Sequence, residues 1–401
     1  MRVMVNCLLA TGPQVGGGFT FLTGLLRALC AVDAENEYIL LVSEANRKHF
    51  TFDAANFGTL VIRGPVHRAL PRLLAENLWV PRLAATRHVD VFFSPNDSLP
   101  PGLRCKTIVA VQNILYFHPP HFAIWSGLPL RQRLRLRLQR SYYLTRTPAA
   151  MLRADRILAI SYETRRQVLE SIPGASENRI DVVYPGVGGW AGGRGPGAPL
   201  PASDDPPGEP FFLSVSSITP YKNIELLLSG FAEFVRQGVG SHRLIIVGRA
   251  QHAAYQRSLE QHAHRLGIAN RVEFRGFATS EELRKLYGTA TGFLLVSSCE
   301  SFGFPVVEAL ACGAPVVVSN VSTPPELVGD AGILVEPGSS AAVTEAMIRL
   351  AIDSGLRARL STAGAARARQ FQWRTAAARF IGVLETLHLD APVVNELGSS
   401  A

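Results

Sequence analysis

Two glutamates toward the C-terminus, Glu300 and Glu308, are the residues whose type and spacing say most about chemistry. A strand is expected to end just before them, so that Glu300 and Gly303 fall in a turn and Pro305 opens a helix. Glu308 then lies one turn inside that helix, among apolar neighbours that argue against a merely solvated charge. The two carboxylates would accept hydrogen bonds from the hydroxyls of a sugar or ribose. Backbone N–H groups at residues 302–304 would suit phosphate oxygens.

A lysine and a glycine loop indicate further anion binding. Lys222 is expected just past a strand at Phe211–Val215 and just before a helix, where its ammonium group could neutralise a diphosphate; a surface lysine in a turn is the alternative. Near the N-terminus, Gly16, Gly17 and Gly18 follow a strand and open a helix, so their N–H groups could meet a phosphate. Because the spacing matches neither the dinucleotide fingerprint nor the phosphate-loop motif, a simple tight turn stays open.

The length and composition indicate a globular protein of two domains. The chain has 401 residues, 47% hydrophobic and 18% charged, which excludes a wholly disordered, collagen-like or coiled-coil chain. No apolar stretch approaches the ~20 residues of a spanning helix, and the first ten residues lack the features of a signal peptide, so we expect a cytoplasmic protein. The five cysteines are scattered, which predicts neither a disulfide framework nor a zinc site.

The excess positive charge is confined to the N-terminal half. Residues 1–187 contain 22 Lys and Arg against 13 Asp and Glu, whereas residues 188–401 contain 18 against 19. The densest segment, residues 130–140, would form a helix with leucines on one face and arginines on another. Such a helix could lie on an anionic membrane surface, and a solvated helix face is the alternative. Nucleic acid is not expected, because no aromatic residues are interleaved with the charge.

A stretch rich in glycine and proline divides the chain. Residues 188–210 hold too many helix and strand breakers for a packed element and predict a linker or surface loop. On each side, short β-like runs alternate with helix-like stretches, which is typical of parallel sheets covered on both faces. The predicted fold class is α/β, with two Rossmann-like doubly wound domains facing a cleft. Ligands in this architecture bind beyond the carboxyl ends of the strands, where the motifs above fall.

The long C-terminal motif resembles the Glu-x7-Glu signature of family-4 retaining glycosyltransferases of the GT-B fold. Similarity extends to the glycine loop at residues 16–18, to the turn around Lys222 and to segments along nearly the whole chain. The motif in this sequence reads Ser298-x-Glu300-x-Phe302-Gly303-x-Pro305-x-x-Glu308-Ala309-x-Ala311-x-Gly313-x-Pro315-Val316.

The resemblance implies a domain division and a role for each candidate residue. Residues 1–187 would bind the acceptor, residues 211–372 a GDP- or UDP-linked sugar, and residues 373–401 would begin with a helix that crosses back to the N-terminal domain. In similar enzymes the counterpart of Lys222 contacts the diphosphate, that of Glu308 the ribose and that of Glu300 the transferred sugar. Neither metal nor cofactor is expected, because Lys222 and helix N-termini can stabilise the leaving diphosphate. The rest of the implied donor site consists of Phe302, Gly303, Phe304, Phe277 and the closing loop with Gly17 and Gly18.

Two positions depart from the family pattern. Where similar enzymes often have an arginine before the lysine, this chain has Ser217, and Arg249 is the candidate substitute cation on the donor diphosphate. Where a His-Asp pair is common, this chain has Gln112 and Asn113 on the acceptor side, so Gln112 could supply only neutral hydrogen bonds. His118 is expected to be a loop or acceptor-side residue rather than a replacement base.

Three functions stay open on this basis. The first is a retaining glycosyltransferase that adds mannose or a related hexose to a lipid-linked or growing cell-surface glycan. Its basic N-terminal half would then meet a diphosphate-lipid acceptor or the inner face of the membrane. The second is a GT-B transferase with a soluble sugar or sugar-phosphate acceptor. The third, suggested only by Ser217 and Gln112, is a catalytically silent binder of a nucleotide-sugar or glycan.

Overall fold

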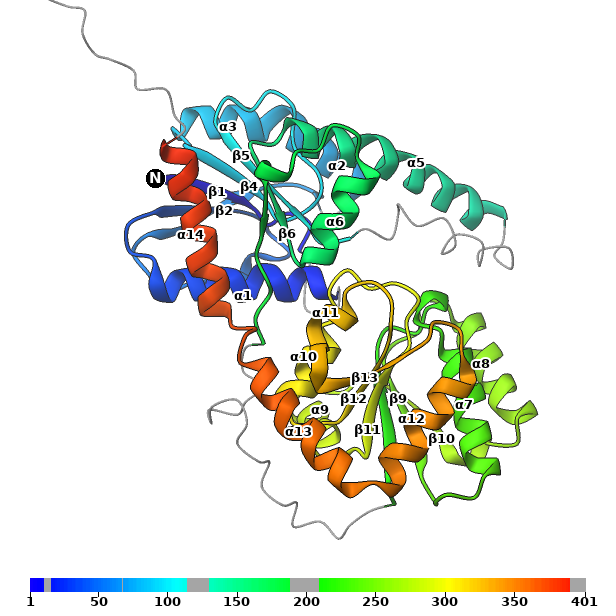
Figure 1. Cartoon of the computed structure of the whole chain (residues 1–401). Helices are drawn as coiled ribbons and strands as arrows, with labels where there is room; N and C mark the ends of the chain where they lie inside the picture. Colours follow the sequence, from blue (N-terminus) through cyan, green and yellow to red (C-terminus); the bar gives the residue numbers. More distant parts are fainter. Residues whose placement is uncertain (11–15, 67, 114–129, 188–208, 390–401) are drawn as a thin grey trace, which may run out of the picture.

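Two parallel β-sheets, each covered by helices on both faces, make up the computed structural model of the chain (Figure 1). The structure describes residues 1–10, 16–66, 68–113, 130–187 and 209–389. His118 and most of the predicted linker lie outside these ranges. The prediction of two doubly wound α/β domains is confirmed.

Within the described residues the N-terminal sheet has seven parallel strands. From edge to edge they are β3 (Phe57–Ile62), β2 (Glu37–Ser43), β1 (Arg2–Asn6), β4 (Val91–Ser94), β5 (Lys106–Val111), β6 (Arg156–Ala159) and β7 (Ile180–Val182). Strand β1 is buried on both faces: Val3 and Val5 pack in one apolar cluster and Met4 in another. Burial on both faces explains why the central strands read as continuous apolar runs.

The C-terminal sheet has six parallel strands among the residues that are described. In spatial order they are β10 (Val272–Gly276), β9 (Arg243–Val247), β8 (Phe211–Val215), β11 (Gly292–Leu295), β12 (Val316–Ser319) and β13 (Gly332–Val335). Strands β8 and β11 are neighbours, in register at Gly292 with Phe212. The loops that follow these two strands therefore meet at one edge of the sheet, and they carry the predicted donor residues.

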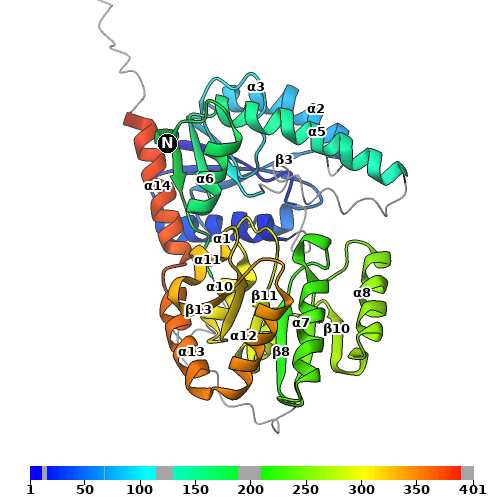
Figure 2. The ribbon, with the colours of Figure 1, turned by 45° about the vertical axis from the view of Figure 1, so that its right-hand side comes forward.

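The helices lie on the two faces of each sheet (Figures 1 and 2). Within the described part of the chain, no helix combines the length and the apolar character needed to cross a bilayer. The N-terminal domain has α1 (Gly17–Val32), the 3₁₀ turn η2 (Arg47–His49), α2 (Ala69–Leu74), the π-helical turn η3 (Ala75–Trp79), α3 (Val80–Thr86), α5 (Leu130–Arg153), α6 (Tyr162–Ser171) and η6 (Glu177–Arg179). The remainder of the chain has η7 (Pro220–Lys222), α7 (Ile224–Arg236), α8 (Ala253–Arg265), η8 (Ala269–Arg271), α9 (Ser280–Thr289), α10 (Phe304–Ala311), α11 (Pro324–Val328), η9 (Gly329–Ala331), α12 (Ser340–Ile352), α13 (Ser354–Ala368) and α14 (Trp373–Leu389).

Helix α14 leaves the C-terminal domain and packs against α1 of the other domain (Figure 1, red and blue). Gly24 on α1 permits the close approach, because a Cβ at this position would lie 2.3 Å from the ring of Trp373. Gly186 also permits close packing against the start of α14, because a Cβ there would lie 2.1 Å from the backbone nitrogen of Trp373. Any larger side chain at either position would push the start of α14 away from the N-terminal domain.

Candidate functional site

A buried ion pair joins the two loops at the carboxyl ends of β8 and β11. The Lys222 ammonium group pairs with Oε1 of Glu300, and only about a tenth of either side chain is exposed (11% and 10%). Ser297 Oγ donates a hydrogen bond of 2.7 Å to the same carboxylate oxygen. Burial lowers the pKa of Lys222, but Glu300, with smaller contributions from Tyr221 and Cys299, raises it, and the net pKa lies above its usual value. The lysine therefore stays charged inside the site.

Backbone contacts fix the two loops to each other. The Ser298 N–H and the Ser298 hydroxyl both donate to the Tyr221 carbonyl, at 2.8 and 3.1 Å. The Lys222 ammonium lies 4.9 Å from the centre of the Tyr221 ring, within the range of a cation–π contact. Asn223 ends the η7 turn in the left-handed conformation, with φ of 58°, and the chain then enters α7. The charged pair is thus held before any ligand arrives.

Glu308 is the second buried carboxyl, on the helix that follows Glu300. Gly303, at φ of 98°, and the proline in the first turn start α10, as the motif predicts. Tyr287 of α9 donates a hydrogen bond of 3.2 Å to Glu308 Oε2. Burial raises the pKa of Glu308 to about 7, and the Tyr287 hydrogen bond acts weakly in the opposite direction. Hydroxyl donors of a ligand would favour the charged form of this carboxyl.

The glycine loop of the N-terminal domain reaches the same region. A Cβ on Gly17 would lie 3.1 Å from the Phe304 ring, and a Cβ on Gly18 would lie 3.3 Å from Oε1 of Gln112. Phe304 also packs edge-on against the buried Phe302, with ring centres 5.1 Å apart. The structure therefore brings together residues that the sequence analysis placed in the donor site and on the acceptor side.

Arg249 and Phe277 lie next to each other at the ends of β9 and β10. The guanidinium carbon of Arg249 is 5.0 Å from the centre of the exposed Phe277 ring. Gly248 allows this path for the chain, because a Cβ there would lie 1.7 Å from the Ser216 carbonyl oxygen. The predicted substitute cation is therefore held against the residue that the resemblance puts beside the base. A role on the diphosphate stays a prediction.

Two buried hydroxyls in the loop that leads to Lys222 were not expected from the sequence. Ser216 Oγ and Thr219 Oγ1 are buried without a hydrogen-bond partner among the described residues. Both belong to the loop between β8 and η7, and the Lys222 N–H bonds to the Thr219 carbonyl at 3.0 Å. An unsatisfied buried hydroxyl is costly, so such groups call for a polar ligand or water. Short hydroxyl residues just before the lysine were the available signal.

The residues predicted for the acceptor side are neutral amides where the structure describes them. The Gln112 amide nitrogen donates to the Pro95 carbonyl, and Gln112 and Asn113 follow β5 in half-buried positions. His118 lies outside the described residues. No three His, Cys, Asp or Glu side chains come together as a metal site in the part of the chain that is described. Metal independence stays a prediction.

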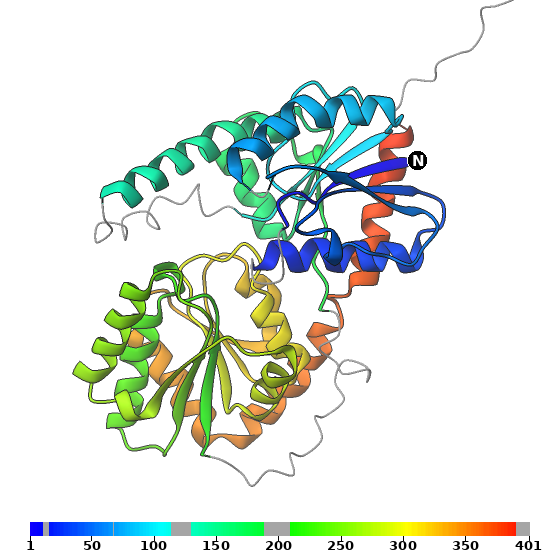
Figure 3. The same cartoon turned by 180° about the vertical axis from the view of Figure 1, so that it is seen from behind.

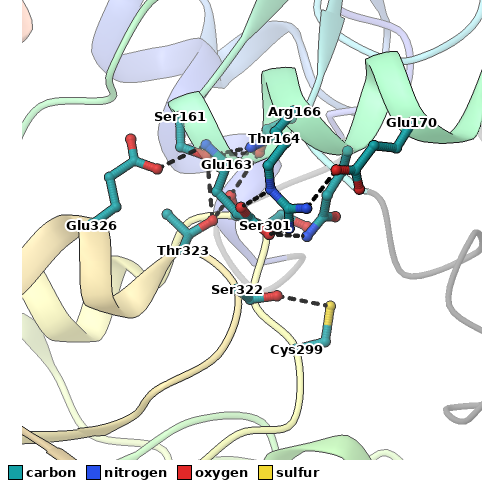
Figure 4. A network of polar contacts seen from close by, with 11 residues as sticks. Ser161, Glu163, Thr164, Arg166, Glu170, Cys299, Ser301, Ser322, Thr323 and Glu326 are labelled. Atoms are coloured by element: carbon teal, nitrogen blue, oxygen red, sulfur yellow. Dashed lines mark hydrogen bonds and ion pairs between the residues drawn. The ribbon is translucent and has the colours of Figure 1, made fainter.

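A polar network connects the domains beside this site (Figure 4). Glu326 of α11 accepts hydrogen bonds of 2.8 Å from the N–H groups of Tyr162 and Glu163, and so caps the start of α6 from the other domain. The Thr164 hydroxyl donates to the Ser301 carbonyl at 3.1 Å, in the turn that follows Glu300. Movement of one domain relative to the other would therefore disturb the turn that contains Glu300 and Ser301.

The region that holds the candidate site matches a known family model. Residues 201–367 match the family model Glycosyl transferases group 1. The match includes the whole second sheet and the loops with Lys222, Glu300 and Glu308. It supports the resemblance at the level of the glycosyltransferase superfamily, while family 4 and the Glu-x7-Glu assignment stay predictions.

Curated relatives are similar over part of the chain. O-antigen chain mannosyltransferase B of Escherichia coli is 31% identical over 178 residues, which cover 44% of this chain and 46% of that protein. A D-inositol 3-phosphate glycosyltransferase of Nocardia farcinica is 34% identical over 232 residues, which cover 55% of this chain and 50% of that protein. The chain spans about half the length of the curated relatives it matches.

Solved structures are similar over nearly the whole chain. Sucrose-phosphate synthase of Thermosynechococcus elongatus aligns with a TM-score of 0.73 at 18% identity, covering 98% of this chain and all of that one (100%). HepE of Anabaena, solved with UDP and glucose, aligns with a TM-score of 0.69 at 19% identity, covering 96% and 100%. At these identities the likeness shows the fold, which is the two-domain GT-B fold.

Proposed function

We propose that this chain is a retaining glycosyltransferase, a hexosyltransferase that uses a nucleotide-sugar without a metal ion. The donor would be GDP- or UDP-linked, with mannose or a related hexose favoured, and the acceptor a lipid-linked or growing cell-surface glycan. The observation that carries the proposal is the buried Lys222–Glu300 pair at the ends of β8 and β11, inside the region that matches the family model. The mannosyltransferase among the relatives supports the choice of sugar.

The charges and hydroxyls around the pair suit a sugar diphosphate. Lys222 would neutralise the diphosphate, and the unpartnered hydroxyls of Ser216 and Thr219 would donate to its oxygens. Glu300 would accept hydrogen bonds from the transferred sugar and Glu308 from the ribose. Each group lies at a carboxyl end of a parallel strand or on the helix that follows, where ligands of doubly wound sheets bind.

The proposed reaction retains the configuration at C1 of the sugar. The acceptor oxygen attacks C1 on the face from which the diphosphate departs, and a new C1–O bond forms. The old C1–O bond breaks with its electron pair on the phosphate oxygen, which also takes the proton of the acceptor hydroxyl. Lys222 stabilises the charge that develops on the diphosphate, and its fixed position means that little reorganisation is needed at that moment.

A soluble acceptor is the second candidate. It is favoured by the D-inositol 3-phosphate glycosyltransferases among the relatives and by the sucrose-phosphate synthase among the similar structures. The neutral Gln112 and Asn113 on the acceptor side suit hydroxyl groups of either acceptor class. Both candidates share the donor site, so they differ only in what enters across the N-terminal domain.

The test is a screen of GDP-, UDP- and ADP-sugars by thermal shift and donor hydrolysis, with and without EDTA. We expect one nucleotide-sugar to stabilise the protein and to be hydrolysed, and Lys222→Met and Glu308→Gln to abolish both effects. The matched control is Lys285→Met, which breaks an exposed pair with Glu281 and should change neither. No response to any donor, or loss of activity in EDTA that added metal restores, would contradict the proposal. Transfer to a lipid-linked glycan rather than to a sugar phosphate then separates the two acceptor classes.

A further inference from the structure

The helix from α2 through η3 presents large apolar side chains to solvent. Leu70, Leu74 and Leu78, spaced four residues apart, are 69%, 54% and 52% exposed, and the neighbouring Trp79 is 51% exposed. The opposite side of the same helix is buried on the sheet through Ala75 and, in α3, through Val80 and Ala84. The exposed side chains are therefore not a face that turns toward the domain core.

Helix α5 lies beside this one and has the same character. The three views of the molecule agree that α5 runs alongside α2 at one end of the N-terminal domain, away from α14 (Figures 1, 2 and 3). Leu134 and Leu138, one turn apart on α5, are 57% and 64% exposed, and Arg137 between them is exposed as well. We use the name leucine surface for six exposed side chains of α2, η3 and α5: Leu70, Leu74, Leu78, Trp79, Leu134 and Leu138.

The charge around the leucine surface is of one sign. Residues 63–87 contain five arginines and one acidic residue, Glu76, which is buried and accepts a hydrogen bond from Asn6. Residues 130–153 contain seven arginines and no acidic residue. Arg68 and Arg82 are exposed beside the leucines of α2 and η3. Among the described side chains, the exposed arginines Arg68, Arg82 and Arg137 share these two segments with no exposed acidic residue.

We propose that the leucine surface docks on an anionic lipid bilayer, with the leucines and Trp79 in the headgroup boundary and the arginines on lipid phosphates. Apolar side chains flanked by arginines match the two components of such a surface, acyl chains and phosphate groups. A solvated helix face would account for the arginines, but it would not account for leucines exposed to water beside them. The contribution of α2 and η3 was not evident in the sequence, where only residues 130–140 were suspected.

Docking would set the position of the cleft relative to the membrane. None of the residues of the candidate site lies on α2, η3 or α5, so the bilayer would leave the donor loops free. One part of this inference rests on the proposed function, namely that a lipid-linked acceptor reaches the donor loops from the membrane side. Membrane binding itself does not, because it follows from the leucine surface alone.

The experiment is co-flotation of the full chain with phosphatidylcholine vesicles, with and without phosphatidylglycerol. We expect binding only with phosphatidylglycerol, weakened by high salt as surface electrostatic attraction is. Leu74→Ser combined with Leu78→Ser should weaken binding about tenfold or more, since two exposed leucines no longer enter the bilayer. Ile352→Ser, which changes an apolar residue that is 67% exposed on the other domain, is the matched control and should bind as the wild type does.

Two further readouts make each outcome decisive. Trp79 fluorescence, taken as the difference between the wild type and Trp79→Phe, should shift to shorter wavelength on phosphatidylglycerol vesicles. Donor hydrolysis should be the same in the wild type and the double leucine variant, so failure of the proposed function would appear in hydrolysis and not in flotation. Equal flotation of the double variant, binding to nucleic acid instead of vesicles, or a dimer that the double variant loses while no vesicle binds, would each overturn the inference.

Discussion

The two domains share one architecture and divide the chemistry unequally. In the C-terminal domain, the loops beyond β8 and β11 hold a buried ion pair, Lys222 with Glu300, and α10 adds the buried Glu308. The β8 loop also holds two buried hydroxyls that have no partner among the described residues. In the N-terminal domain, the start of α1 and the end of β5 bring glycines and the neutral Gln112 together, and exposed arginines such as Arg82 and Arg137 lie on α3 and α5. One domain therefore has the fixed polar groups that a preorganised donor site would need, and the other has a glycine loop and an exposed basic surface.

Burial makes this difference energetic as well as geometric. Charges taken out of water are costly unless they are paired and hydrogen-bonded, and breaking a buried pair costs about 3–5 kcal/mol. The C-terminal domain therefore carries charged groups whose burial is costly, as electrostatic preorganisation of a donor site would require. Exposed arginines of the other domain, such as Arg82 and Arg137, stay in contact with water and cost little. Variants that remove one group from each domain test the contrast.

The largest effect is expected at Glu300. Glu300→Gln keeps the shape of the side chain and removes the negative charge beside Lys222, so donor hydrolysis and transfer should fall about 100-fold or more. Gln112→Met, the matched change in the N-terminal domain, should cost about tenfold or less, because it removes only neutral hydrogen bonds. Steady-state kinetics of the two variants measure this ratio. Equal losses would mean that the two domains contribute alike.

The next effect concerns pH and Glu308. Burial raises the pKa of this carboxyl from 4.5 to about 7, so the folded state holds the proton more tightly than the unfolded state. Stability present below about pH 4.5 is then lost as the pH rises through 7, on the order of 3 kcal/mol in total. Glu308→Gln has no proton to lose at this position. The Tm of this variant, relative to the Tm of the wild type, should therefore increase from pH 5 to pH 8. Parallel Tm profiles for the two proteins would exclude a strongly shifted carboxyl.

A smaller effect is expected at the contact between the domains. Glu326→Gln removes the charge that caps the start of α6, which should cost about 1–2 kcal/mol of stability and lower kcat more than it raises KM. Glu170→Gln breaks an exposed pair with Arg166 on the same helix and should change little. Thermal unfolding and kinetics provide the readouts. A stability loss without any change in kcat would restrict Glu326 to a structural role.

The smallest effect separates a ligand-binding hydroxyl from a structural one. Thr219→Val removes an orphaned buried hydroxyl, so donor affinity should weaken about fivefold while the Tm of the free protein stays the same or rises. Thr344→Val is the matched control, because the Thr344 hydroxyl donates to the Gly230 carbonyl at 2.9 Å. It should lower the Tm and leave donor affinity unchanged. The opposite pattern would place Thr219 outside the donor site.

The sequence predicts the central strands of both sheets, and it misses two of the edge strands. Strands buried on both faces are continuous apolar runs, whereas β3 and β13 are only partly buried at sheet edges and were not expected. The other two edge strands, β7 and β10, were expected from the sequence. The largely apolar run from Arg2 to Leu9 is longer than strand β1, which ends at Asn6. The Asn6 Oδ1 accepts a hydrogen bond from the Leu8 N–H and turns the chain there. Local side-chain bonds of this kind outweigh hydrophobic pattern.

Within the site, the loops were predictable and the long-range partners were not. Gly303, with the proline that follows it, fixed the turn and helix around Glu308, because their backbone preferences are local. Tyr287 lies 21 residues from Glu308, to which it donates a hydrogen bond. Glu326 lies 164 residues from Tyr162, whose N–H it accepts a bond from at the start of α6. No rule of sequence spacing predicts contacts over such separations. The exposed leucines of α2 and η3 were equally hidden, because helical periodicity does not tell which face is covered.

The most direct test of the account is calorimetric titration of GDP- and UDP-hexoses into the wild type, Lys222→Met and Gln112→Met. If the C-terminal domain is a preorganised donor site, one nucleotide-sugar binds the wild type, Lys222→Met weakens its affinity at least about tenfold through loss of a charge-assisted contact, and Gln112→Met leaves it nearly unchanged. Equal weakening by both variants, or no binding of any nucleotide-sugar to the wild type, would contradict it.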